Sequence, residues 1–142
     1  MTGFNKVYLD TAPLIYFLDD IPVYGKTVER ILTDLLTSNK SIVTSVITCA
    51  EYLVYPYRTD NQKKIDTFWN FLKNCNIPLY KVNVAVAEKA AEIRAEYRYF
   101  KAIDSLQLSL AVSHNCDLFL TNDKQLCQYK GLRCLTVDEY II

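Results

Sequence analysis

Short apolar segments of β type alternate along this chain with longer segments of helical periodicity. The β-type runs cover residues 6–9, 41–44, 77–82, 118–120 and 133–136. The helical segments cover residues 12–18, 25–37, 45–54, 62–73, 84–97 and 103–114, with a short turn at 123–129. This alternation favours a parallel sheet with helices on both faces, because each parallel connection needs a crossover of helical length. We therefore predict an α/β fold, a three-layer α/β/α sandwich around a central, mainly parallel sheet.

The chain has 142 residues, 51% of them hydrophobic, which is enough for one globular domain with its own core. No repeat, low-complexity tract or linker interrupts it, so we predict a single domain over residues 1–142. No apolar run approaches the roughly 18 residues that a membrane span needs. The start MTGFNK is too polar for a signal peptide. We expect a cytoplasmic protein without membrane contact.

Cysteine spacing and charge exclude little but set two expectations. The five cysteines, Cys49, Cys75, Cys116, Cys127 and Cys134, form no C-x-x-C or Cys/His pattern. We predict reduced thiols in or near the core. The 16 basic and 16 acidic side chains give a formal net charge of zero, so bulk charge does not indicate a nucleic-acid binder. Any polyanionic partner must be held locally.

Three acids lie at or soon after the predicted strands, where sheets of this class form their ligand sites, and a fourth opens a helix. Asp10 and Asp123 each follow a strand, Glu51 lies about two turns into the next helix, and Asp104 opens another. If the sheet is doubly wound, its connectivity allows all four to converge on one end. Crowded carboxylates raise one another's pKa unless a divalent cation neutralises them. Oxygen ligands suit Mg²⁺ or Mn²⁺, which points towards phosphate chemistry.

Each acid also has a purely structural explanation. Asp10, Asp123 and above all Asp104 precede helical segments and are candidates for capping them. Glu51 has apolar neighbours in SVITCAEYLVY, where burial of an unpaired carboxylate is costly, so it calls for a partner or a cation. The only histidine, His114, is expected at a helix end or on the surface, not in catalysis. Three glycines are too few for either glycine-rich nucleotide loop.

The segments VYLDTAPLIYFLD, TSVITCAEYL, KAIDSLQLSLAV and LFLTNDKQL follow one another along the chain. In this order they resemble the motifs of PIN-domain ribonucleases, especially the VapC-type toxins of prokaryotic toxin–antitoxin pairs. The resemblance covers essentially the whole chain. One departure is Ala12-Pro13, where many family members carry a polar residue after the first Asp-Thr; proline is tolerated in a first helical turn.

The resemblance implies a metal-dependent ribonuclease that hydrolyses RNA phosphodiesters. Asp10, Glu51, Asp104 and Asp123 would be the catalytic acids and would hold one or two Mg²⁺ or Mn²⁺ ions. The resemblance also implies a VapB-like antitoxin as partner and a homodimer as assembly. The residues expected to orient the ligands or to touch phosphate are Thr11, Thr48, Thr121 and Asn122.

The segment RAEYRYFK places Arg98 and Lys101 among aromatic side chains just ahead of Asp104. Such a mixture can bind phosphates and stack bases, and it is equally compatible with an ordinary helix end. Trp69, in FWNFL, is expected in the core.

Two rival functions stay open at this point. One is a non-catalytic PIN-like scaffold, which the four intact acids disfavour. The other is a metal-dependent phosphatase or phospho-acceptor domain of related topology. A phospho-acceptor domain calls for a pair of acids at the first strand's end, whereas this chain has Asp10 alone there.

Overall fold

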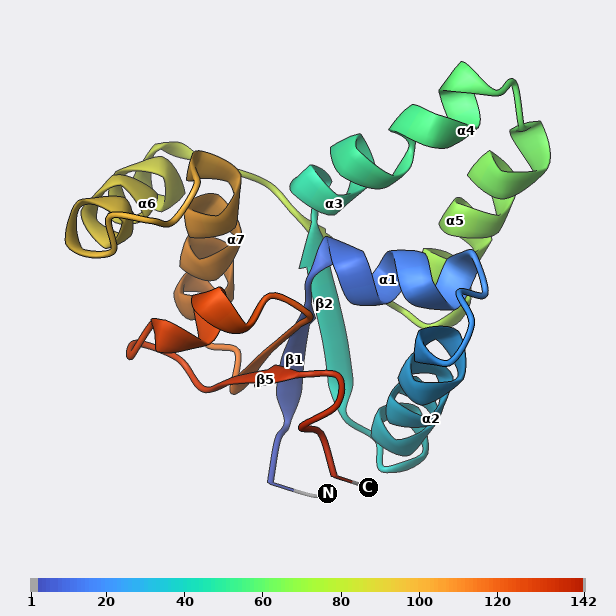
Figure 1. Cartoon of the computed structure of the whole chain (residues 1–142), viewed down its shortest axis with the longest axis horizontal. Helices are drawn as coiled ribbons and strands as arrows, with labels where there is room; N and C mark the ends of the chain where they lie inside the picture. The colour runs from blue at the N-terminus through green and yellow to red at the C-terminus, as the bar shows by residue number, and fades with distance from the viewer. Residues whose placement is uncertain (1–2, 142) are drawn as a thin grey trace.

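A five-stranded parallel sheet runs through the centre of the computed structural model, which describes residues 3–141 (Figure 1). Residues 1, 2 and 142 of the predicted domain lie outside this range. The strands are β1 (Lys6–Leu9), β2 (Ser41–Ser45), β3 (Leu79–Tyr80), β4 (Leu118–Thr121) and β5 (Cys134–Thr136). Their order is β3-β2-β1-β4-β5, and all four pairings within the described range are parallel. The order reverses next to β1, so a crevice is expected between the carboxyl ends of β1 and β4.

The connections between strands are helical. The α-helices are α1 (Thr11–Leu18), α2 (Tyr24–Thr37), α3 (Val46–Tyr52), α4 (Val54–Arg58), α5 (Gln62–Asn74), α6 (Val84–Glu96) and α7 (Ala102–Ser113), and a 3₁₀-helix, η1 (Lys124–Gln128), follows β4. None of the helices in residues 3–141 is long and apolar enough to cross a membrane.

The pleat of the central strands sends alternate side chains into two separate cores. Leu9 and Leu120 belong to the core that contains residues of α1, α2 and α5. Tyr8 and Phe119 belong to the core that contains residues of α6 and α7, and their rings stack with centroids 5.2 Å apart. Figure 1 shows the two groups of helices on opposite sides of the sheet. The predicted three-layer α/β/α architecture is confirmed.

The largest local difference from prediction follows β2. One helix was expected over residues 45–54 and a loop after it, but α3 ends at Tyr52 and a short helix, α4, occupies Val54–Arg58. Pro56 is the third residue of α4, where its missing N–H has no intrahelical partner to lose. A proline near the end of an apolar run therefore begins a new helix here. The β-type run 77–82 is also shortened, to Leu79–Tyr80.

The prediction that Trp69 packs in the core is wrong. The inward face of α5 is formed by Ile65, Phe68, Phe71 and Leu72. Trp69 is 44% exposed, with its ring edge-on to Phe68. The apolar stripe of α5 is already complete without it, so the indole lies at the stripe's margin.

The prediction that all five cysteines are free thiols is wrong for two of them. Cys127 in η1 and Cys134 in β5 form a disulfide, whereas Cys49, Cys75 and Cys116 are free. The chain turns back after η1, and the Cα atoms of the pair come to 4.9 Å, within the usual range for a disulfide. A spacing of seven residues matches no cysteine motif, so the sequence carried no signal for this pair.

Candidate functional site

Asp10 directly follows the carboxyl end of β1 and is the N-cap residue of α1, and its side chain is almost fully buried. Its Oδ1 atom accepts hydrogen bonds from the backbone N of Thr11 at 2.8 Å and from Nε2 of Gln107 at 2.9 Å. Its Oδ2 atom accepts from Oγ1 of Thr121 at 2.7 Å. The predicted capping role is confirmed, and two further donors show that the carboxylate also belongs to a larger polar site.

The position of Asp10 makes its charge costly. Burial raises the pKa of Asp10 to about 6, and the hydrogen bonds from Thr121 and from the backbone of Thr11 oppose that rise. The nearby carboxylates of Asp104 and Glu51 raise it further. Three hydrogen bonds to a charged acceptor are worth about 1.5–3 kcal/mol each, yet they do not fully offset burial. A cation that approaches the remaining lone pair of Asp10 would therefore stabilise its charged form.

Asp104 lies in the first turn of α7 and is half-buried. Asp104 was predicted to cap this helix from the position before it. That prediction is wrong, because Lys101 occupies that position and makes no side-chain cap. Burial raises the pKa of Asp104, Asp123 and Glu51 raise it further, and the Lys101 side chain and backbone lower it. Asp104 is thus within electrostatic reach of the other three acids of the predicted set.

Glu51 differs from expectation in its burial. It was placed among apolar neighbours, but its side chain is on the exposed face of α3. Its Oε1 atom accepts a hydrogen bond of 2.6 Å from Oγ1 of Thr11. The apolar neighbours in the sequence point to the other faces of the short helix, so proximity along the chain overstated the burial of this carboxylate.

Threonine hydroxyls join the first strands to the helices after them. Thr48, fully buried in α3, has its Oγ1 atom 3.1 Å from that of Thr11 and 2.9 Å from that of Thr44. Thr44 in turn donates to the backbone oxygen of Leu9 at 2.8 Å. Thr11 and Thr48 therefore hold α1 and α3 at a fixed distance, which sets the separation of Asp10 and Glu51.

The residues after β4 divide between two roles. Asp123 caps η1 by accepting from the backbone N of Gln125 at 3.0 Å, as predicted, and its own N–H donates to Oγ1 of Thr121. Asn122 makes no hydrogen bond to the four acids among the described residues: its Nδ2 atom donates to the hydroxyl of Tyr16 in α1 at 2.6 Å. Thr121 thus contacts Asp10 directly, whereas Asn122 ties the loop after β4 to α1.

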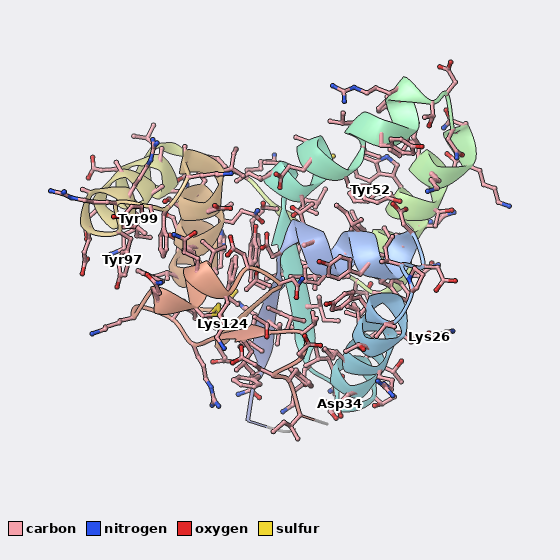
Figure 2. The ribbon with its side chains drawn as sticks, viewed as in Figure 1. Lys26, Asp34, Tyr52, Tyr97, Tyr99 and Lys124 are labelled. Carbon is pink, nitrogen blue, oxygen red and sulfur yellow. A yellow bond between two sulfur atoms is a disulfide. The ribbon has the colours of Figure 1, made fainter. Side chains whose placement is uncertain are left out.

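Arg98 and Lys101 lie on the exposed turn between α6 and α7. The aromatic residues of this turn divide, since Tyr97 stacks on the buried ring of Phe100 while Tyr99 is 81% exposed. Figure 2 shows Tyr97 and Tyr99 at the α6 side of the molecule, across the sheet from α1 and α2. In this turn the stacked rings of Tyr97 and Phe100 therefore pack inward, whereas the ring of Tyr99 and the two cationic side chains are exposed.

Gln107 is the main residue of this site that sequence reasoning missed. It is 2% exposed, and its Nε2 atom donates to Asp10. The available signal was its spacing: Gln107 follows Asp104 by three residues, so the two share one face of α7. An amide within an apolar stretch such as IDSLQLSLAV is an exception that calls for a buried partner.

The donor set fits a hard divalent cation. All four predicted ligands are carboxylates, and the pKa of the most buried one is raised both by burial and by its acidic neighbours, a cost that a cation removes. Across residues 3–141, no three acidic, histidine or cysteine side chains stand close enough to form a finished metal shell. The acids share the end of the sheet, and a cation would still have to draw them together.

The fold and the site define an α/β protein with a buried carboxylate, Asp10, at the switch point of a parallel sheet. The family model of the PIN domain matches residues 7–132. The chain belongs to the PIN-domain family, as the four sequence segments predicted. None of the curated proteins matches the chain.

Several solved structures have a similar fold. VapBC2 from Rickettsia felis, bound to a DNA fragment from its promoter, is 22% identical with a TM-score of 0.73, over 92% of this chain and 98% of that one. A toxin–antitoxin complex from Klebsiella pneumoniae is 18% identical with a TM-score of 0.73, over 94% and 99%. FitAcB from Neisseria gonorrhoeae is 18% identical with a TM-score of 0.71, over 94% and 99%. At such identities the likeness concerns the fold.

Proposed function

We propose that this protein is a metal-dependent endoribonuclease and the toxin of a toxin–antitoxin pair. The observation that carries the proposal is the buried carboxylate of Asp10 at the switch point of a PIN-family sheet, within electrostatic reach of Asp104 and Glu51. Asp123 completes the set through its effect on Asp104. The only histidine is at the other end of α7 from Asp104, so it has no part in this site.

In this proposal Asp10, Glu51, Asp104 and Asp123 hold Mg²⁺ or Mn²⁺. When bound, such a cation lowers the pKa of water and stabilises negative charge on a phosphodiester. The chain's own contribution is orientation: Thr121 and the backbone of Thr11 fix Asp10, and the Thr11 hydroxyl fixes Glu51.

The decisive experiment compares two substrates. Purified protein with Mn²⁺ is incubated with end-labelled single-stranded RNA and, separately, with a small phosphomonoester such as p-nitrophenyl phosphate. We expect internal cleavage of the RNA and no release of nitrophenol. Hydrolysis of the phosphomonoester alone would favour the phosphatase alternative, and inactivity on both would favour the non-catalytic scaffold.

We expect Arg98 and Lys101 to contribute to RNA binding by contacting phosphates. Replacing both with Ala in an Asp10→Asn background, where the RNA stays intact, is expected to weaken binding. The slope of log affinity against log salt should fall by roughly 0.7 for each lost contact. The control is Lys63→Ala on the exposed side of α5. An unchanged salt slope in the double variant would place the RNA elsewhere.

The proposal includes an antitoxin as the physiological partner. Its support is the fold shared with the toxin–antitoxin complexes and a set of exposed apolar side chains on α4 and α5, namely Val54, Tyr55, Tyr57 and Trp69. A homodimer, which the resemblance implies, stays a prediction that light scattering of the purified protein would test. An RNA-cleaving toxin acts where cellular RNA is, so the proposal places it in the cytoplasm.

A further inference from the structure

A series of buried hydrogen bonds reaches Asp10 from the α7 side of the sheet. Gln107 donates from Nε2 to Oδ1 of Asp10 at 2.9 Å, and its Oε1 atom accepts from the hydroxyl of Tyr8 at 3.0 Å. Tyr8 is fully buried, and its hydroxyl also lies 2.7 Å from Oγ of Ser45. The series of hydrogen bonds therefore runs from Ser45 in β2 through Tyr8 in β1 and Gln107 in α7 to the carboxylate of Asp10.

The chemistry of these groups allows one direction of hydrogen bonding. A carboxylate only accepts, so the amide NH₂ of Gln107 must face Asp10 and the amide oxygen must face Tyr8. The single proton of the Tyr8 hydroxyl then goes to Gln107. Ser45, whose Oγ accepts from the backbone N of Ile47, is free to donate its own proton to Tyr8. Each member thus fixes the orientation of the next.

The same contacts determine which part of Asp10 stays available. An ionised carboxylate offers about four lone-pair sites. Thr11 and Gln107 use both sites of Oδ1, and Thr121 uses one of Oδ2. The remaining lone pair is on Oδ2, so the rotation of the carboxyl group decides where a cation is met.

We propose that Gln107, held by Tyr8, is a positioning residue that fixes the carboxylate of Asp10 in the orientation in which it binds the divalent cation. This inference rests on the proposed function. Hydrogen-bond partners behind a metal ligand typically change metal affinity or activity by about 10–100-fold when they are removed. Gln107 touches neither substrate nor reacting atoms in this assignment and acts through Asp10.

The test measures Mn²⁺ binding to the purified protein by calorimetry, without RNA. Gln107→Met keeps the length of the side chain and removes its hydrogen bonds to Asp10 and Tyr8, together with a longer one of 3.5 Å from Thr48, while Tyr8 keeps Ser45 as a partner. We expect its Mn²⁺ affinity to fall by about 10–100-fold. Tyr8→Phe, which retains the ring stack on Phe119, is expected to show a smaller loss of the same kind. In cleavage assays kcat should fall in both variants while KM for RNA stays unchanged.

Ser109→Ala is the matched control. Ser109 is fully buried on the same helix and donates to the backbone oxygen of Val86 at 2.7 Å, away from Asp10. It should lose stability without losing Mn²⁺ affinity. Wild-type affinity in folded Gln107→Met would overturn the positioning role, and if that variant fails to fold, unchanged affinity in Tyr8→Phe would overturn it. A wild-type protein that binds no Mn²⁺ would instead overturn the proposed function, and this inference with it.

Discussion

Asp10→Asn is expected to reduce RNA cleavage by at least about a thousandfold, because it removes the most buried of the four carboxylates that would hold the cation. The variant should remain folded. An amide oxygen can accept from Thr11 and Gln107 as the carboxylate does. The amide NH₂ can donate to Oγ1 of Thr121, although the proton of that hydroxyl then loses its present acceptor.

The loss of cleavage is compared with the stability of the same variants in denaturant. Without metal, Asp10→Asn should unfold at an equal or higher denaturant concentration than the wild type, since a buried charge and its repulsion from Asp104 and Glu51 are gone. Asp104→Asn should behave in the same way. Asp66→Asn, an exposed acid on α5, is the control and should cleave normally. Unfolding of both active-site variants would mean that these acids serve the fold by capping, and cleavage at the wild-type rate by either would remove it from the site.

Most of the fold could be predicted from the sequence because its signals are local. Each of the five β-type runs overlaps an observed strand, and the alternation of Leu9 and Tyr8 between two cores explains why neighbouring residues of a run are both apolar. The elements that were mispredicted depend on non-local packing. The exposure of Trp69 depends on which face of α5 is filled, and the Cys127–Cys134 pair depends on where the chain turns back.

The candidate site was only partly predictable, for a related reason. Acids that follow strands can be recognised because parallel topology brings strand ends together. The groups that hold them come from other elements: Tyr8 points away from the α1 side of the sheet, and Gln107 reaches Asp10 from 97 residues along the chain. Neither belongs to a motif. The exposure of Glu51 likewise depends on which face of α3 packs against the rest of the protein, which its apolar neighbours in the sequence did not indicate.

Removing divalent cations is expected to abolish RNA cleavage and to leave a protein whose stability falls as the pH rises from about 4 to 7. The activity is lost because the chain offers carboxylates and no catalytic histidine at the site. The stability change follows from Asp10. Its pKa rises from 3.8 to about 6 on folding, so the folded state keeps a proton there that the unfolded state has lost.

The sign of the effect is fixed by that difference. Protonated Asp10 is compatible with burial, so its contribution to stability is present below pH 3.8 and is lost as the pH rises through about 6. The loss amounts to roughly 3 kcal/mol at about 1.4 kcal/mol for each pKa unit. Asp10→Asn has no proton to lose at this position and should show a flatter profile. Burial also raises the pKa of Asp104, which adds to the slope in the same direction.

Denaturant unfolding in excess chelator between pH 4.5 and 7.5 measures the two profiles, and RNA cleavage is followed in the same buffers. Mn²⁺ added at pH 7 should restore cleavage. It should also stabilise the wild type, by about 2.7 kcal/mol at a free concentration of 100 times its Kd, while stabilising Asp10→Asn much less. Parallel profiles of stability against pH for the two proteins would show that burial does not raise the pKa of Asp10. Cleavage that persists undiminished in chelator would refute the metal-dependent mechanism.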